Sequence, residues 1–202
     1  YAYDDRWGKM KITDFIKRRV IRLHPMVVVG ALIGGVMFYW QGCSVWDVSK
    51  VTILALFIAT FMNALLIPAT PGTEVRGLGE MYPLNGPSWS LFFEYIGNIL
   101  YALVIRKFST KALAVLVFAA GCGLAAFAIG GPYGDICAGF SLTGIEFTGG
   151  LLRLLFSFSA GLLLFRIFKP IHVKGAFWIC SLSIVVLLAV PRLGGAEYLW
   201  VN

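Results

Sequence analysis

The sequence predicts an all-α fold, a polytopic transmembrane helix bundle with five or six membrane segments. Hydrophobic residues make up 59% of the 202 residues and charged residues only 13%. An ordinary globular chain has about 45–50% and about 25%, respectively. A domain of this size leaves too much surface exposed to hide so many apolar side chains from water. The solvent of this chain is therefore predicted to be lipid.

A helix needs about 20 mostly apolar residues to span a bilayer, and apolar runs close to this length recur along the chain. We predict one membrane domain over 1–202, with segments at 24–41, 50–67, 88–105, 111–130, 149–168 and 175–191. Residues 68–87 hold four prolines and four glycines, which predicts a loop. The glycine-rich stretch 131–148, which carries Asp135 and Glu146, predicts a second loop.

The first membrane segment follows a basic amphipathic stretch at 10–22. Pro25 predicts a helix break or a helix start where the two meet. Gly30 and Gly34 have the spacing that lets two membrane helices approach closely, although ordinary membrane-helix glycines explain them equally well.

Most of the net charge of +7 lies before the first segment, because residues 1–22 hold seven Lys or Arg against three Asp. A basic face beside a membrane attracts anionic lipid or a phosphate-bearing ligand. Nucleic acid is not an expected partner, because no basic stripe continues beyond residue 22. The four cysteines show no CxxC spacing, so no metal site is expected.

The positive-inside rule gives a conflict. The basic stretch 9–22 should be cytoplasmic, and so should the clusters at 106–111 and 166–174. The last two agree with each other and place 68–87 and 131–148 outside. Reaching 68–87 from residue 22 then needs an odd number of crossings, whereas two segments are predicted there. Either one of the two is re-entrant or interfacial, or one cluster lies on the unfavoured side.

The segment 88–105 carries a polar stripe. At about 100° per residue, its polar and small residues fall within an arc of about 100°; these are Ser90, Glu94, Gly97, Asn98 and Tyr101. The opposite side holds Leu91, Phe92, Ile99 and Leu103. The stripe should therefore face a cavity or a partner helix. A carboxylate at the depth of Glu94 either pairs with a cation or stays protonated.

Arg153 is a candidate partner for Glu94, because it shares a helix face with Ser157 and Gly161. It lies near the end of its segment, so it could instead extend to the lipid headgroups. The Arg153–Glu94 pair is a hypothesis that the positions of the two side chains can test.

Arg18, Arg19 and Arg22 place several guanidinium groups on one helical turn. Guanidinium groups match phosphate oxygens in a bidentate way, so we interpret the three as a candidate phosphate site. A simple positive-inside anchor is the alternative. The two histidines, His24 and His172, have no acid nearby at triad-like spacing and are expected to be surface residues.

Three motifs occur in a recognisable order. They are Lys17-Arg18-Arg19-x-x-Arg22-Leu-x-Pro25, Asn85-Gly-Pro87-Ser-Trp89-Ser90-Leu91-x-x-Glu94 continuing to Tyr101, and Arg153-x-x-Phe156-x-x-x-x-Gly161. Together they resemble the acyltransferase 3 family of integral membrane acyltransferases. That family is a bundle of about ten helices, so the resemblance implies that this chain corresponds to its middle.

The resemblance implies transfer of an acyl group, with acetyl expected, from acyl-CoA to a hydroxyl of a cell-surface or lipid-linked carbohydrate. It also implies the bacterial inner membrane as the location. Arg18, Arg19 and Arg22 would bind the donor, acetyl-CoA, and Glu94 would be the catalytic candidate. Residues expected to bind the acceptor are Trp89, Ser90, Asn98, Tyr101 and Arg153.

The histidine proposed as catalytic in the family lies on a helix that would precede Tyr1, and His24 does not occupy its place. The chain alone is therefore expected to be inactive. A transporter or flippase of lipid-linked sugars is the alternative, because it too would carry a polar stripe and an intramembrane Arg–Glu pair.

Overall fold

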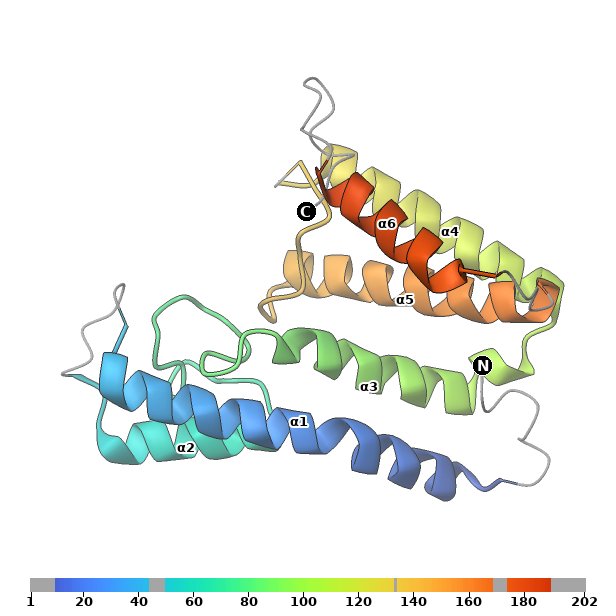
Figure 1. Cartoon of the computed structure of the whole chain (residues 1–202). Coiled ribbons are helices and arrows are strands. Elements are labelled where there is room, and N and C mark those ends of the chain that lie inside the picture. The colour runs from blue at the N-terminus through green and yellow to red at the C-terminus, as the bar shows by residue number, and fades with distance from the viewer. Residues whose placement is uncertain (1–9, 44–49, 133, 169–173, 190–202) are drawn as a thin grey trace.

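The computed structural model describes residues 10–43, 50–132, 134–168 and 174–189. Its described helices are α1 (Ile12–Gln41), α2 (Ile53–Ala64), α3 (Ser88–Leu103), the short 3-10 helix η3 (Ile105–Lys107), α4 (Thr110–Gly130), α5 (Gly144–Ile167) and α6 (Ala176–Ala189). Figure 1 shows them as a bundle joined by loops, without a strand in the described part of the chain. The all-helical fold class is confirmed. His172 lies outside the described residues.

Among the described residues, three helices are long and apolar enough to cross a membrane: α1 with 30 residues, α4 with 21 and α5 with 24. By contrast, α2 has 12 residues. At 1.5 Å per residue it is about 18 Å long, against about 30 Å for the hydrocarbon core. The segment predicted at 50–67 is therefore too short to cross as a helix.

One end of the bundle gathers the basic clusters. Phe15 of α1, Tyr101 of α3, Leu113 of α4 and Leu162 of α5 belong to one buried hydrophobic cluster. This cluster joins the start of α1, the end of α3, the start of α4 and the end of α5, as Figure 1 also shows. We call this the basic end, because described residues of the three basic clusters, among them Arg18, Arg106 and Arg166, lie at these helix termini.

The two long loops meet at the other end, which we call the loop end. The backbone N–H of Met81 donates a hydrogen bond to the carbonyl of Phe140 at 2.8 Å, which ties 65–87 to 131–143. α1 extends from the basic end to the loop end, whereas α2 runs back alongside only part of α1 (Figure 1). Of the two predicted explanations of the crossing conflict, the short α2 is consistent with the one in which a segment between residues 22 and 88 is re-entrant or interfacial.

Pro25 lies inside α1, which continues unbroken from Ile12 to Gln41. The predicted break or start at this proline is therefore wrong. A proline removes one backbone hydrogen bond, here the one to the carbonyl of Ile21. Its ring lies on the exposed side of the helix. In apolar surroundings the helix keeps its remaining hydrogen bonds, because no other partners are at hand for those backbone groups.

The glycines of α1 contact a loop as well as a helix. A Cβ on Gly30 would meet the side chain of Asn85, and a Cβ on Gly34 would meet the backbone carbonyl of Leu84. Gly35 instead faces Thr60 of α2. The close approach predicted from Gly30 and Gly34 occurs, but its partner is the loop 65–87, through the Asn85 side chain and the Leu84 backbone, and not a second helix.

This loop is buried where it lies on α1. Met81, Tyr82 and Leu84 are all less than one-tenth exposed. Irregular backbone at membrane depth is tolerated only where protein or a water-filled cavity surrounds it. The glycines of α1 provide the room that lets the loop be covered by protein.

Candidate functional site

The polar stripe of α3 has a buried half and an accessible half. Gly97, Asn98 and Tyr101 are buried, and a Cβ on Gly97 would lie 2.7 Å from the side chain of Leu154 on α5. Glu94 is half-buried and Ser90 is exposed. Toward the basic end the stripe therefore packs against partner helices, as expected, and toward the loop end its polar groups stay accessible.

Glu94 and Asn98 each carry side-chain oxygen atoms that have no partner among the described residues. The Asn98 side chain donates from Nδ2 to the backbone carbonyl of Glu94 at 2.8 Å. Its Oδ1 is buried and has no hydrogen-bond partner among the described residues. The Glu94 carboxylate likewise takes part in no hydrogen bond or ion pair within the part of the chain that the structure describes. Because Asn98 is enclosed by its neighbours and Glu94 is only half-buried, Glu94 is the candidate of the two for contact with a substrate.

Arg153 does not pair with Glu94, and that hypothesis is wrong. Its guanidinium donates to the carbonyl of Ala138 at 3.0 Å and lies 4.8 Å from the ring centroid of Trp89. Glu94 is five residues beyond Trp89, which places it about 140° around α3 and about 7.5 Å farther along the axis. The arginine therefore binds a loop carbonyl and an aromatic face, and not Glu94.

Glu146 is predicted to lie in the second loop, but it belongs to α5 and anchors that loop through hydrogen bonds. Glu146, in the first turn of α5, is 9% exposed and accepts hydrogen bonds from the N–H groups of Gly139 at 2.7 Å and Phe140 at 3.1 Å. The helix begins five residues earlier than the predicted segment, at Gly144. The sequence signal was an acidic residue at the start of an apolar span, which is a favourable place for a helix N-terminal carboxylate.

Trp89 packs at the centre of this arrangement. Its ring contacts those of Phe140 and Phe93, with centroids 5.1 Å and 6.1 Å away. Gly139 has a φ of 115°, and a Cβ there would lie 2.9 Å from the Trp89 ring. The next residue, Ser90, donates its hydroxyl hydrogen to the carbonyl of Pro87 at 2.8 Å. The structure thus gives Trp89 a packing role between α3, α5 and the loop end.

The three predicted arginines differ in burial. Arg18 and Arg22 are exposed, whereas Arg19 is half-buried and lies 5.4 Å from the ring centroid of Phe15. Phe15 in turn contacts Tyr101 of α3, with ring centroids 5.8 Å apart. The Phe15–Tyr101 contact therefore connects the arginine-bearing turn to the buried end of the polar stripe.

This contact also fixes the height of the other residues. α1 and α3 run in opposite directions (Figure 1). Arg22 is seven residues after Phe15, and Glu94 is seven residues before Tyr101. Seven residues are about 10.5 Å and nearly two whole turns, so each side chain stays on its original helix face. Arg22 and Glu94 therefore come to a similar height, but Arg22 is exposed and lies about 200° around α1 from both Val20 and His24. No ion pair joins Arg22 to Glu94 within the described residues.

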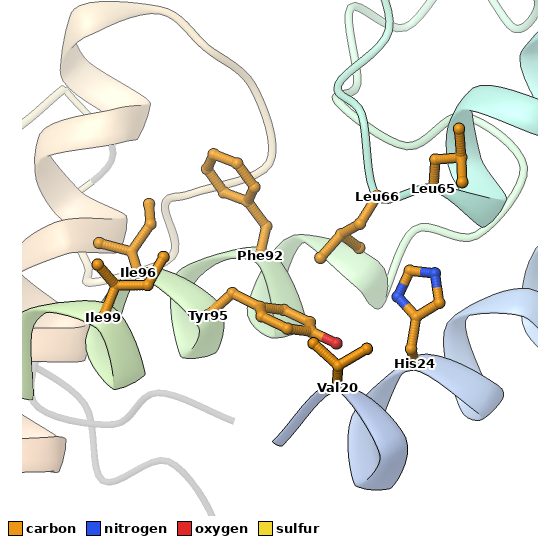
Figure 2. A pocket seen from close by; sticks show the side chains of 8 residues that line it. All are labelled: Val20, His24, Leu65, Leu66, Phe92, Tyr95, Ile96 and Ile99. Carbon is orange, nitrogen blue, oxygen red and sulfur yellow. The ribbon is translucent and has the colours of Figure 1, made fainter. Parts of the chain in front are cut away.

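His24 is not a simple surface residue. It is half-buried on α1, and its ring meets that of Tyr95 edge-on, with centroids 6.5 Å apart. Both rings line a cavity of about 360 Å³ between α1, the end of α2 and α3. Figure 2 shows the Tyr95 hydroxyl directed toward Val20 and His24. Sequence reasoning missed this site because its residues come from three distant segments.

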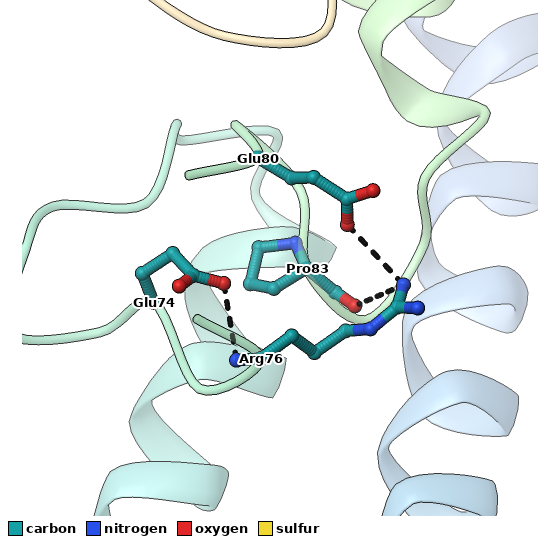
Figure 3. Close-up of polar contacts among 4 residues, drawn as sticks. All are labelled: Glu74, Arg76, Glu80 and Pro83. Carbon is teal, nitrogen blue, oxygen red and sulfur yellow. Dashed lines mark hydrogen bonds and ion pairs between the residues drawn. The ribbon is translucent and has the colours of Figure 1, made fainter. Parts of the chain in front are cut away.

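The loop 65–87 has its own polar centre (Figure 3). Arg76 donates from Nη1 to Glu80 at 3.2 Å and to the carbonyl of Pro83 at 3.3 Å, and its backbone N–H donates to Glu74 at 3.0 Å. Burial raises the pKa of Glu80 above its ordinary value, and this outweighs the opposite effect of the Arg76 guanidinium. These contacts hold the turn that precedes the motif residues of α3.

Comparison with known proteins identifies one family. A family model described as an acyltransferase domain, Acyl_transf_3, matches residues 2–202. The match includes the arginines of α1, the polar stripe of α3 and Arg153 of α5. No curated protein and no solved structure matches the chain.

Proposed function

The chain belongs to the acyltransferase 3 family of membrane transferases, and from this premise we propose that it takes part in moving an acyl group, with acetyl expected, from acyl-CoA to a hydroxyl of a cell-surface or lipid-linked carbohydrate. The observation that carries the proposal is the family match over residues 2–202, which includes the arginines of α1 and the polar stripe of α3. The exposed arginines and the half-buried Glu94 carboxylate, which has no partner among the described residues, supply the charged groups that such a reaction uses. The bacterial inner membrane is the proposed location.

The arginines suit the anionic part of the donor. Arg18 and Arg22 are exposed at the basic end, and Arg19 lies beside them on the Phe15 ring. Guanidinium–phosphate contacts are charge-assisted and often bidentate, and hydrogen bonds of this kind are about twice as strong as neutral ones. The three arginines therefore support binding of the CoA phosphates at the basic end.

The polar stripe suits the acyl transfer itself. The acceptor hydroxyl oxygen attacks the thioester carbonyl carbon, a C–O bond forms and the C–S bond breaks. The hydroxyl proton passes through a general base to the departing sulfur, which leaves as the CoA thiol. In this chain, the half-buried Glu94 carboxylate would orient that base or the acceptor, whereas Asn98 is buried and would act only by holding this turn of α3.

The transporter alternative was based on a polar stripe, which fits both functions, and on an intramembrane Arg–Glu pair. Arg153 instead binds the Ala138 carbonyl and Trp89, so this support is removed.

The test uses the double variant Arg19→Ala/Arg22→Ala, with Lys17→Ala as the matched control. Lys17 is an exposed cation on the same helix and differs from Arg22 in the face it occupies. We expect the double variant to weaken acyl-CoA binding at least tenfold, because charge-assisted hydrogen bonds are lost. Lys17→Ala should change it less than twofold. Equilibrium binding of radiolabelled acetyl-CoA to the full chain in lipid nanodiscs measures both, and equal affinities in all three proteins would refute the arginine assignment.

A further inference from the structure

We propose that the cavity between α1, the end of α2 and α3 binds the acyl chain of the donor, which makes this protein able to accept chains longer than acetyl. The inference rests on the proposed acyl-CoA donor and adds a place for its apolar part. For brevity we call this space the α1–α3 cavity. It is lined by Val20, His24, Leu65, Leu66, Phe92, Tyr95, Ile96 and Ile99.

The lining fits an alkyl chain with one polar group. Six of the eight lining side chains are aliphatic or phenyl groups, and the polar atoms belong to His24 and Tyr95. The volume of about 360 Å³ falls in the range of small-ligand sites. It is much more space than the two carbons of an acetyl group need. The cavity therefore matches an acyl group with a sizeable chain.

Tyr95 supplies the specific observation. Its hydroxyl is buried and has no hydrogen-bond partner in the described part of the chain. Figure 2 shows it directed into the space beside Val20 and His24. A buried hydroxyl without a partner loses hydration without compensation, so a ligand that accepts its hydrogen bond is favoured. The carbonyl oxygen of an acyl group is such an acceptor.

The position of the cavity suits a ligand whose charged head lies at the basic end. Val20, which follows Arg19 directly, and Ile99 line the part nearest that end. From Ile99 to Phe92 the lining extends seven residues along α3, about 10.5 Å. Leu65 and Leu66 close the inner side. Arg18 and Arg22 lie on the other side of α1 from Val20, whereas Arg19 directly precedes it, so an amphiphile with its phosphate at Arg19 and its chain directed inward would follow this path.

The inner wall is held firmly. Leu66 has a φ of 57°, a left-handed conformation that is uncommon for a leucine. Its carbonyl accepts a hydrogen bond from the Tyr82 hydroxyl at 2.9 Å, and Tyr82 is 1% exposed. Strained backbone persists where surrounding structure over-determines it, and it is common at ligand sites. The end of the cavity should therefore limit the chain length.

The experiment is photolabelling of the full chain in nanodiscs with octanoyl-CoA that carries a diazirine at the chain terminus. Mass spectrometry locates the label, which we expect on Leu65, Leu66 or Phe92. Ile99→Trp fills the cavity and should reduce this labelling at least fivefold. The control is Leu103→Trp, on the same helix and also exposed but outside the cavity lining, and it should leave labelling unchanged. Tyr95→Phe should weaken octanoyl-CoA binding about threefold to tenfold while CoA itself binds as before.

The outcomes separate the two proposals. If CoA binds through the arginines but the label falls outside the cavity, the inference is wrong and the donor site stands. If a diazirine phosphatidylcholine labels the cavity and excess octanoyl-CoA does not displace it, the occupant is a membrane lipid and the inference is again wrong. If neither CoA nor octanoyl-CoA binds, the proposed function fails, and the inference fails with it.

Discussion

The two ends of the bundle are held together by different interactions. At the basic end, apolar side chains such as Phe15, Leu113 and Leu162 interlock between helices. At the loop end, charged side chains bind backbone groups: Glu146 accepts from Gly139 and Phe140, and Arg153 donates to Ala138. Glycines there let backbone approach backbone.

This difference predicts different tolerance to substitution. Side chains in an apolar cluster can adjust around a small substitution, although a loss of side-chain volume still lowers stability. A backbone carbonyl lying against a helix glycine has no such freedom, because the chain on both sides of it is fixed. Adding or removing a small group at the loop end should therefore change the free energy of unfolding more than the same change at the basic end. The basic end should tolerate changes in its exposed charges.

The largest effect is expected for Gly34→Ala. Its new Cβ would collide with the carbonyl of Leu84, so α1 and the loop must separate, at a cost of about 1–3 kcal/mol or more. The control is Gly161→Ala on α5, where nothing lies within 4 Å. Alanine there should stabilise the helix, by up to about 1 kcal/mol. Reversible unfolding in mixed micelles measures the change in the free energy of unfolding for both variants. If both variants were stabilised, or both destabilised, the difference drawn between the two ends would be contradicted.

Glu146→Ala should have the next largest effect, because it leaves two backbone N–H groups without their carboxylate. We expect a loss of about 2–3 kcal/mol, and a smaller loss for Glu146→Gln, which keeps one acceptor oxygen. Faster proteolysis within 134–143 would show that the loop has been released. Asp135→Ala provides the comparison, because its contact with the Cys137 N–H is exposed. If Glu146→Ala and Asp135→Ala were cleaved at equal rates, burial would not determine how strongly these carboxylate–backbone hydrogen bonds hold the loop.

The interaction energy between Arg153 and Trp89 should be smaller than the two effects above. In a double-mutant cycle with Arg153→Met and Trp89→Phe, we expect an interaction energy of about 0.5–2 kcal/mol from the cation–π contact. The single variant Arg153→Lys should recover part of it, since it keeps the charge but not the planar group that also reaches Ala138. Additive effects of the two substitutions on the free energy of unfolding would show that the contact does not stabilise the loop end.

The smallest effect concerns pH. Burial raises the pKa of Glu80 in the folded chain, so the folded state retains this proton where the unfolded state has lost it. Stability should therefore fall as pH rises from about 4, the ordinary glutamate range, through the raised pKa. Glu80→Gln should remove this part of the pH dependence. Unfolding curves of the two proteins that run parallel between about pH 4 and 7 would contradict the assignment.

The polar stripe shows how far sequence reasoning reached. Ile99 and Leu103 lie on the exposed side of α3, while Gly97, Asn98 and Tyr101 lie on the buried side. This followed from the helical period alone. The α1–α3 cavity did not follow, because Val20, Leu66 and Tyr95 belong to segments whose relative positions no local pattern specifies.

What the sequence alone determined is the membrane-helix fold, the family, and the faces of α3, since each depends on composition, motif order or a repeat of 3.6 residues. Only the tertiary structure decided that Pro25 lies within a continuous helix, that Gly34 contacts a loop, and that Arg153 binds Ala138 instead of Glu94. The reason is physical. The deciding partner in two of these three cases is a backbone carbonyl, which every residue carries and which therefore leaves no mark in the sequence.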